Sequence, residues 1–145
     1  MNDPVVAVQC VDWHDRQDEL KAIRKSVFID EQHVPKELEW DGQDANCTQF
    51  LASINSRAVA TARLTPQGQI ARMAVLAEYR GQHVGSRLLA AVIDHAKRNG
   101  YQQVFLHAQV NVIPFYERYG FIAEGELFMD AGIAHRTMRL VRDDD

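Results

Sequence analysis

The segment EYRGQHVGSRLLAAVIDHA, residues 78–96, joins a short stretch with two glycines to a run with helical periodicity. The apolar positions of that run fall on one stripe of a helical wheel, whereas the charged positions fall elsewhere. The stripe consists of Leu88, Leu89, Val92, Ile93 and Ala96. Lys97, Arg98 and Gly100 follow, which is the pattern of a helix C-terminus. The segment therefore predicts a turn followed by a helix over residues 85–99.

The turn has the features of an anion-binding site. An apolar run at 69–75, which predicts a strand, precedes it, and the first turn of the following helix has unpaired backbone N–H groups. The helix dipole favours negative charge at this end. Gly81 and Gly85 let the backbone approach a ligand closely, and Arg80 adds a charged donor. The sequence lacks the Walker A and dinucleotide-binding glycine patterns, so an ordinary helix start with glycines for packing is the alternative.

The rest of the chain alternates between strand-like and helix-like patterns. Short apolar runs predict strands at 5–10, 47–54, 58–65, 69–75, 103–108, 125–130 and 135–141. Helical spacing of apolar residues predicts helices at 13–30, 85–99 and 112–120. Pro35 and Gly42 break the polar stretch 31–46, which we expect to be a loop, with a short helix inside it as the alternative. The order β-α-β-β-β-α-β-α-β-β predicts a mixed sheet with helices packed on it, in the α/β or α+β class.

Length and composition indicate one globular domain that spans residues 1–145. Hydrophobic residues make up 46% of the chain and charged residues 25%, as is usual for soluble proteins. The net charge of −4 offers no basic surface for nucleic acid or an anionic membrane. No apolar run approaches the ~20 residues of a membrane span, and no signal-peptide pattern opens the chain, so we expect a cytoplasmic protein. Composition does not distinguish a monomer from a homodimer.

The cysteines and histidines show no metal-site pattern. Cys10 and Cys47 each lie in or beside an apolar run, which predicts buried free thiols in a reducing compartment, with a disulfide as the alternative. The six histidines are spread along the chain, so no two of them share a zinc-ligand spacing on one element. We therefore expect no metal.

Three stretches resemble the GNAT superfamily of N-acetyltransferases. VLAEYRGQHVGSRLL (75–89) is similar to the acetyl-CoA-binding segment, whose loop reads Arg/Gln-x-x-Gly-x-Gly/Ala. VIPFYERYGF (112–121) is similar to the later Phe/Leu-Tyr-Glu-x-x-Gly-Phe segment, and IRKSVFIDEQHVP (23–35) resembles the first helix of a bacterial, ElaA-like branch. The three stretches lie in the family's order. The resemblance implies a single-domain, mixed and mostly antiparallel sheet with helices on both faces, splayed between the fourth and fifth strands.

The resemblance also implies how acetyl-CoA is held. Backbone N–H groups of the loop and helix start would bind the pyrophosphate, namely those of Arg80, Gly81, Gln82, His83, Val84, Gly85 and Ser86. Main-chain groups of Met73, Ala74 and Val75 would pair with the pantetheine arm, and one N–H there would face the acetyl carbonyl as an oxyanion donor. A bulge in this strand would part it from strand 103–108 and open a slot for the thioester.

Two positions depart from the family pattern. His83 stands where the loop usually has glycine, and histidine tolerates a left-handed backbone better than most residues. Gln109 stands where many relatives have an asparagine that contacts the pantetheine. Glutamine keeps the amide with a longer reach, and nearby Asn111 is a second candidate for this contact.

Tyr116 matches the tyrosine that acts in many relatives as a general acid toward the sulfur of coenzyme A. The alternative is a core aromatic residue beside Phe115 and Phe121. We expect the catalytic role, because Phe115 can fill the core while Tyr116 faces the slot.

The general base stays open. The strand position where some relatives have glutamate is occupied here by residues near Arg72. An arginine cannot accept a proton at neutral pH. His107 and Glu31 are the candidates, with water as a relay equally open. The structural alternative for His107 is a half-buried strand residue with a backbone partner. For the carboxylates of this region the alternative is a solvated loop, namely for Glu31, Glu37, Glu39 and Asp41.

These features together indicate an enzyme that moves an acetyl group from acetyl-CoA to a primary amine by direct attack. Neither cysteine lies in a segment suited to a nucleophile, so no acyl-enzyme is expected. The alternatives are a non-catalytic, coenzyme A-binding sensor or interaction module, and an enzyme that transfers longer acyl chains or acetylates proteins or peptides. Loop 30–41 contains Asp30, Glu31, Glu37, Glu39 and Asp41 against Lys36, which predicts a preference for cationic amines.

Overall fold

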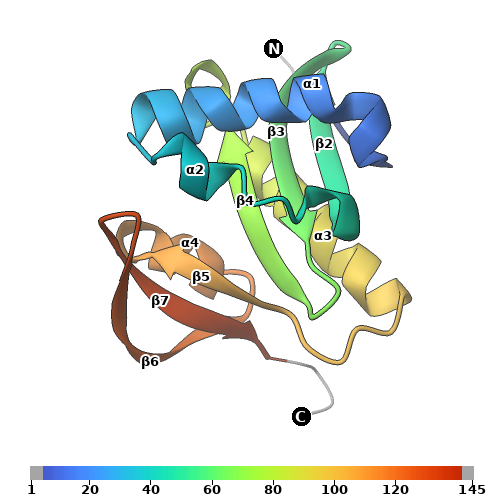
Figure 1. Ribbon diagram of the computed structural model, residues 1–145. Helices are drawn as coiled ribbons and strands as arrows, with labels where there is room; N and C mark the ends of the chain where they lie inside the picture. The colour runs from blue at the N-terminus through green and yellow to red at the C-terminus, as the bar shows by residue number, and fades with distance from the viewer. Residues whose placement is uncertain (1–4, 142–145) are drawn as a thin grey trace.

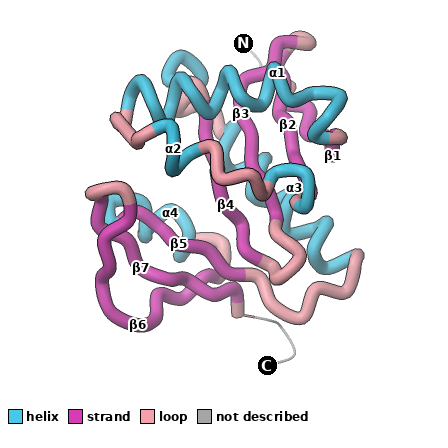
Figure 2. The backbone as a smooth tube through the Cα atoms, viewed as in Figure 1, coloured by secondary structure: helices cyan, strands magenta, loops and turns pink. Residues whose placement is uncertain are grey.

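The computed structural model describes residues 5–141, which form one seven-stranded sheet (Figure 1). The strands are β1 (Val6–Val11), β2 (Thr48–Ile54), β3 (Arg57–Leu64), β4 (Gln69–Val75), β5 (Phe105–Gln109), β6 (Phe121–Asp130) and β7 (Ile133–Leu140). Their order in space is β1-β2-β3-β4-β5-β7-β6, so β1 and β6 are the edge strands (Figure 2). Neighbouring strands are antiparallel, except that β4 and β5 are parallel. The predicted mixed, mostly antiparallel sheet is confirmed.

The helices are α1 (Trp13–Arg24), α2 (Lys36–Glu39), α3 (Val84–Arg98) and α4 (Ile113–Glu117). Asp12 caps α1, because its carboxylate accepts hydrogen bonds from the N–H groups of His14 and Asp15. A π-helix, Lys25–Glu31, continues α1. No helix within residues 5–141 is long and apolar enough to cross a membrane.

Helices α1 and α3 cover opposite faces of the sheet (Figure 1). On the α3 face, the buried stripe of that helix packs against apolar residues of β2 to β5 and β7. On the α1 face, Leu20, Ile23 and Val27 form a smaller core with Leu51 and Ala74. The alternation of strand side chains lets β4 supply residues to both cores. This arrangement confirms helices on both faces of the sheet.

Most predicted elements are confirmed, with shifted ends. The helix predicted over 13–30 is α1 followed by the π-helix, and the short-helix alternative within 31–46 is α2. Strand β6 begins earlier than predicted, directly after Gly120, because it continues through an irregularity between Glu124 and Phe128, where the left-handed Gly125 interrupts the strand pattern.

Both cysteines are free thiols. The expectation of burial is wrong for Cys10, which is exposed because β1 is an edge strand, and Cys47 is half-buried.

Strands β4 and β5 separate after a short contact. They pair only at Gln69 with Phe105 and at Ile70 with Leu106. Directly beyond, Arg72 has a left-handed backbone with φ 55°, and the register of β4 against β3 shifts. Such a bulge bends a strand and increases its twist. The arm formed by β5, β7 and β6 therefore diverges from β4 (Figure 1), which confirms the predicted splay between the fourth and fifth strands.

Candidate active site

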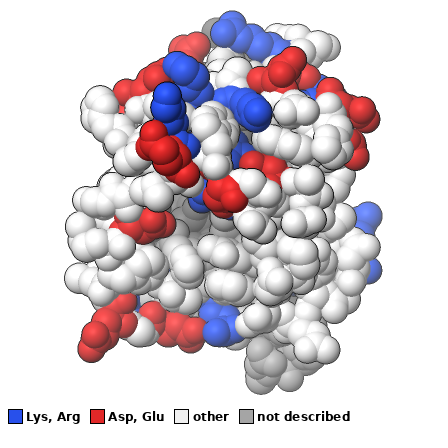
Figure 3. Space-filling view, viewed as in Figure 1, with Lys and Arg blue, Asp and Glu red and all other residues white. Residues whose placement is uncertain are grey.

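A cavity of about 710 Å³ lies where β4 and β5 separate. Figure 3 shows a hollow between the charged surface over α1 and α2 and the mostly uncharged surface of the β5–β7–β6 arm. The predicted site residues that line the cavity are Glu31, Met73, Ala74, Val75, Arg80, Gly81, His83, Val84, Gly85, Ser86, His107, Gln109, Asn111 and Tyr116. Gln82 is not part of the wall, and its side-chain amide donates to the carbonyl of Glu78 at 3.3 Å. The volume falls within the ~300–1,000 Å³ typical of small-molecule sites.

The turn before α3 has the backbone conformation that glycine would favour. Gly81 has φ 81° and His83 has φ 64°, so both are left-handed. His83 thus adopts the conformation expected at a glycine position. No side chain among residues 5–141 caps the start of α3, which leaves its first-turn N–H groups available to a ligand.

Gly85 keeps the adjoining part of the slot open. A Cβ atom at this position would lie 3.7 Å from Cζ of Phe115 and 3.9 Å from Cγ2 of Val75. Both neighbours line the cavity. A larger side chain here would therefore extend between α3 and the opposite wall.

Arg80 connects three parts of the site. Its guanidinium donates two hydrogen bonds to the carboxylate of Glu31, at 2.6 and 2.8 Å, and its Nε donates to the carbonyl of Val75 at 3.0 Å. The π-helix, the end of β4 and the glycine turn are thereby linked. The hydrogen bonds from Arg80 lower the pKa of Glu31.

The end of β4 presents main-chain groups to the cavity. Ala74 lies opposite Thr61 of β3, whereas the ladder with β5 stops at Ile70. The β5-facing edge beyond Ile70 is therefore free of pairing with β5. Met73 and Val75 direct their side chains toward the α3 core, and Ala74 toward the α1 core.

Tyr116 packs as an aromatic residue and also lines the cavity. Its ring lies 5.1 Å from that of Phe115 and 5.9 Å from that of Phe121, measured between centroids. Its hydroxyl has no hydrogen-bond partner within residues 5–141. Burial raises the pKa of the phenol to about 12, so it remains protonated at neutral pH.

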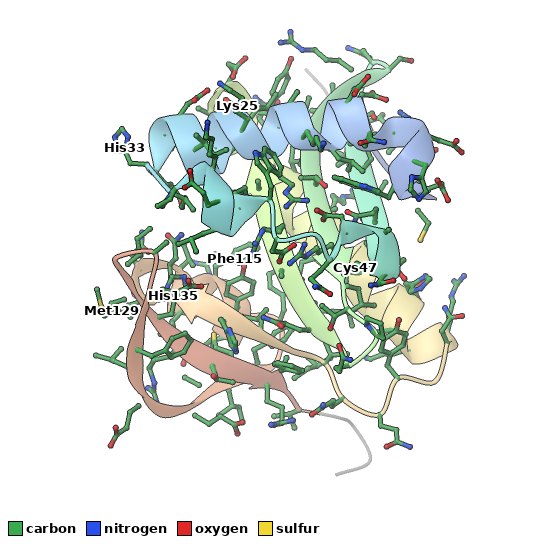
Figure 4. The ribbon with its side chains drawn as sticks, viewed as in Figure 1. Lys25, His33, Cys47, Phe115, Met129 and His135 are labelled. Carbon is green, nitrogen blue, oxygen red and sulfur yellow. The ribbon has the colours of Figure 1, made fainter. Side chains whose placement is uncertain are left out.

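The face of β5 and β7 that is turned toward the π-helix carries polar side chains. His107 and Gln109 alternate on β5 with the buried Leu106 and Ala108, and His135 lies opposite Gln109 on β7. The amide of Gln109 donates to Oε1 of Gln32 at 2.9 Å and so connects the two sides of the cavity. Figure 4 shows His135 on the β5–β7 arm beside the slot, with Phe115 nearby.

The family of the chain follows from its sequence. A family model described as an acetyltransferase (GNAT) domain matches residues 12–142. The chain belongs to the GNAT family.

Relatives and solved structures agree with this family. An uncharacterized N-acetyltransferase of Bacillus subtilis (strain 168), YjcF, is 31% identical over 121 residues, which are 80% of this chain and 86% of the relative. The structure is similar to an acyl-CoA N-acyltransferase from Pseudomonas aeruginosa, with TM-score 0.83, 27% identity and coverage of 94% of this chain and 100% of the other. It is likewise similar to ElaA of Escherichia coli, with TM-score 0.84, 25% identity and the same coverages of 94% and 100%.

The acidic loop of this GNAT protein is largely paired with arginines. Glu39 is 2% exposed and contacts Arg24, and Asp41 contacts Arg63, each through short hydrogen bonds. The interpretation as a solvated loop carboxylate is therefore wrong for Glu39, whereas Asp41 is exposed and paired at the same time. The side chain of Arg72 extends from the bulge toward the same loop and donates a hydrogen bond to the carbonyl of Leu38 at 3.1 Å. The pairs involve residues far apart in the sequence, so no local sequence pattern could predict them.

These ion pairs weaken the expected preference for cationic amines. Asp30 pairs with Lys25 and Glu31 with Arg80, in addition to the pairs of Glu39 and Asp41. A carboxylate already neutralised by a cation attracts a second cation weakly. Among the described residues, Glu37 is the one loop carboxylate without an ion pair, so the loop gives little reason to favour cationic over neutral amines.

His107 lines the cavity near the end of the β4–β5 contact. It is exposed rather than half-buried, and its Nδ1 lies 3.4 Å from Nε2 of Gln69, so its partner is a side chain and not the backbone. Partial loss of water lowers its pKa, and the nearby His135 adds to this effect while Asp130 opposes it. The lowered pKa favours the neutral form of His107.

His135 is a cavity residue that the sequence analysis did not identify. Only 8% of it is exposed, its ring stacks on Phe128, and it lines the cavity. The available signal was its position at the start of a predicted strand that could pair with strand 103–108. That pairing depends on the β5–β7 register, which periodicity alone does not determine.

Proposed function

We propose that this protein transfers an acetyl group from acetyl-CoA to a primary amine by direct attack. The observation that carries the proposal is the continuity of the cavity. One cavity joins the uncapped start of α3, through the β4–β5 slot, to the polar face of β5 and β7. A thioester held in the slot would thus lie between an anion-binding helix start and a site for the amine.

The residues present fit acetyl-CoA. The first-turn N–H groups of α3, together with the left-handed turn at Gly81 and His83, suit a pyrophosphate. Because the guanidinium of Arg80 is occupied by Glu31, we assign pyrophosphate binding chiefly to the backbone. The free edge of Met73 to Val75 suits the amide groups of pantetheine, with Gln109 and Asn111 at the opposite wall.

Tyr116 would donate a hydrogen bond to the departing sulfur. Its hydroxyl is protonated, lacks a partner within residues 5–141 and lines the cavity. A main-chain N–H near the bulge of β4 would stabilise the oxyanion that forms when the amine attacks. Because burial raises the phenol pKa to about 12, hydrogen bonding to the thiolate is favoured over complete proton transfer.

The test is acetyl transfer across a panel of neutral, cationic and anionic primary amines. We expect release of coenzyme A thiol together with an acetylated amine identified by mass spectrometry. Tight binding of coenzyme A with no turnover on any amine, peptide or protein acceptor would instead indicate the non-catalytic sensor.

The acyl group is tested in the same assay. The structural neighbour from Pseudomonas aeruginosa is described as an acyl-CoA N-acyltransferase, without restriction to acetyl. We expect acetyl-CoA to give the highest kcat/KM in a series of acyl-CoA thioesters of increasing chain length. A maximum at a longer chain would replace acetyl by that acyl group and leave the rest of the proposal intact.

A further inference from the structure

The two histidines of the β5–β7 face differ in which ring nitrogen is free. His135 Nδ1 lies 2.7 Å from the carbonyl oxygen of Ile133. A carbonyl oxygen can only accept a hydrogen bond, so the proton of the neutral imidazole must be on Nδ1. The lone pair is therefore on Nε2, which has no hydrogen-bond partner within residues 5–141.

His107 has the opposite arrangement. Its Nδ1 faces the amide nitrogen of Gln69, which donates, so the lone pair of the neutral His107 ring is already engaged and its proton is on Nε2. His107 would have to break this contact before it could accept a proton. His135 would not.

The surroundings of His135 fix its ring in place. The imidazole stacks on Phe128 with an interplanar angle of 23° and a centroid distance of 5.8 Å. It lies across from Gln109, which is held by Gln32, and it is 8% exposed while lining the cavity. A buried, oriented imidazole with a free lone pair is what a general base requires.

We propose that His135, through Nε2, is the general base that deprotonates the acceptor amine; this rests on the proposed acetyl transfer. Nε2 takes one proton from the substrate ammonium, and the freed nitrogen lone pair forms the bond to the thioester carbonyl carbon. The carbon–sulfur bond then breaks, and its electron pair leaves on sulfur as a thiolate that accepts a hydrogen bond from the Tyr116 hydroxyl. The second proton lost by the nitrogen neutralises the thiolate, and His135 releases its proton to solvent.

The test variant is His135→Asn. The asparagine amide can take the place of Nδ1 and donate to the carbonyl of Ile133, so the variant keeps this hydrogen bond and removes the basic ring nitrogen, while the stacking on Phe128 is lost. We expect kcat to fall about 10²–10⁴-fold with unchanged coenzyme A affinity, and the melting temperature to fall only by the effect of the lost stacking. His14→Asn, at an exposed position of α1, is the matched control and should retain the wild-type rate.

A second readout separates proton transfer from a structural role. The acceptors are an alkylamine turned over by the wild type and its β-fluorinated analogue, whose ammonium is much more acidic and needs less help from a base. In His135→Asn, the loss of kcat/KM should be large for the alkylamine and much smaller for the fluorinated amine. Equal losses for both amines would overturn the proposal.

His107→Asn, which keeps an oxygen to accept from Gln69, compares the two histidines directly. A larger and basicity-dependent loss in His107→Asn than in His135→Asn would assign the base to His107 and overturn the inference. An unchanged rate in His135→Asn would overturn it as well. A wild type that acetylates no amine would instead refute the proposed function, and the role of His135 with it.

Discussion

In the proposed acetyl transfer, the hydroxyl of Tyr116 assists the departing sulfur, while its ring packs against aromatic neighbours. Tyr116→Phe keeps those contacts and removes a donor that stays protonated throughout the usual assay range, since burial raises its pKa to about 12. We predict a fall in kcat of about 10²–10⁴-fold with little change in the affinity for coenzyme A. Steady-state kinetics and calorimetry measure the two quantities separately. A wild-type kcat in this variant would mean that Tyr116 has a purely structural role.

Asp41 should contribute stability in a pH-dependent way. Partial burial alone would raise its pKa, but the hydrogen bonds from Arg63 and from the N–H of Gln43, with the charge of Arg72, outweigh burial and hold the pKa well below its usual range. The stabilisation is thus complete above the unfolded-state pKa of about 3.9 and is lost as the pH falls through the lower folded-state value.

We therefore predict that wild type exceeds Asp41→Asn in stability most at neutral pH, and that the difference shrinks below about pH 4. Urea unfolding at several pH values measures it. A difference that stays constant down to pH 2 would mean that the carboxylate charge of Asp41 contributes nothing.

Helix α2 and the turn at 44–46 are held to α1 by a buried arginine. Arg24 is 1% exposed and contacts Glu39 and Asp44, with its guanidinium 5.1 Å from the ring centroid of Trp40. Without Arg24, the buried carboxylates of Glu39 and Asp44 keep only their second partners, Arg72 and Arg63, and breaking buried ion pairs typically costs about 3–5 kcal/mol. We predict a loss of that size in the free energy of unfolding for Arg24→Met.

Arg16→Met is the matched control for this change. Arg16 pairs with Glu19 on the exposed side of the same helix, and surface pairs of this kind contribute little. Denaturant unfolding should show a large loss for Arg24→Met and almost none for Arg16→Met. Similar losses would mean that the buried cluster does not hold α2 in place.

The elements of this fold could be predicted wherever the sequence pattern is local. The apolar stripe of α3 and the glycine turn before it can each be recognised from a few consecutive residues. The left-handed backbone at His83 could be expected because histidine tolerates this conformation better than most residues. The pairs of Glu39 and Asp41 with arginines could not be predicted, because their partners lie on α1 and β3. His135 was missed for the same reason, since its role depends on which strand lies beside β7.

The molecule as a whole is built around the separation of two parts of one sheet. The α1-covered strands and the β5–β7–β6 arm share the α3 core but only two residue pairs between β4 and β5. A hydrogen bond from Gln109 to Gln32 connects the two sides of the resulting cavity. The fold thereby keeps main-chain groups of β4 free for a ligand, at the point where a helix start offers further N–H groups.

Binding of coenzyme A at this point, compared between wild type and Gly85→Val, is the most direct test of the account. The valine side chain would extend into the slot toward Phe115 and Val75, whereas Ala90→Val places the same residue on the exposed side of α3 as a matched control. Isothermal titration calorimetry should show binding to wild type and Ala90→Val, and at least about a tenfold loss, roughly 1.4 kcal/mol, for Gly85→Val with an unchanged melting temperature. Equal affinity in all three proteins would contradict the assignment of the cavity to coenzyme A.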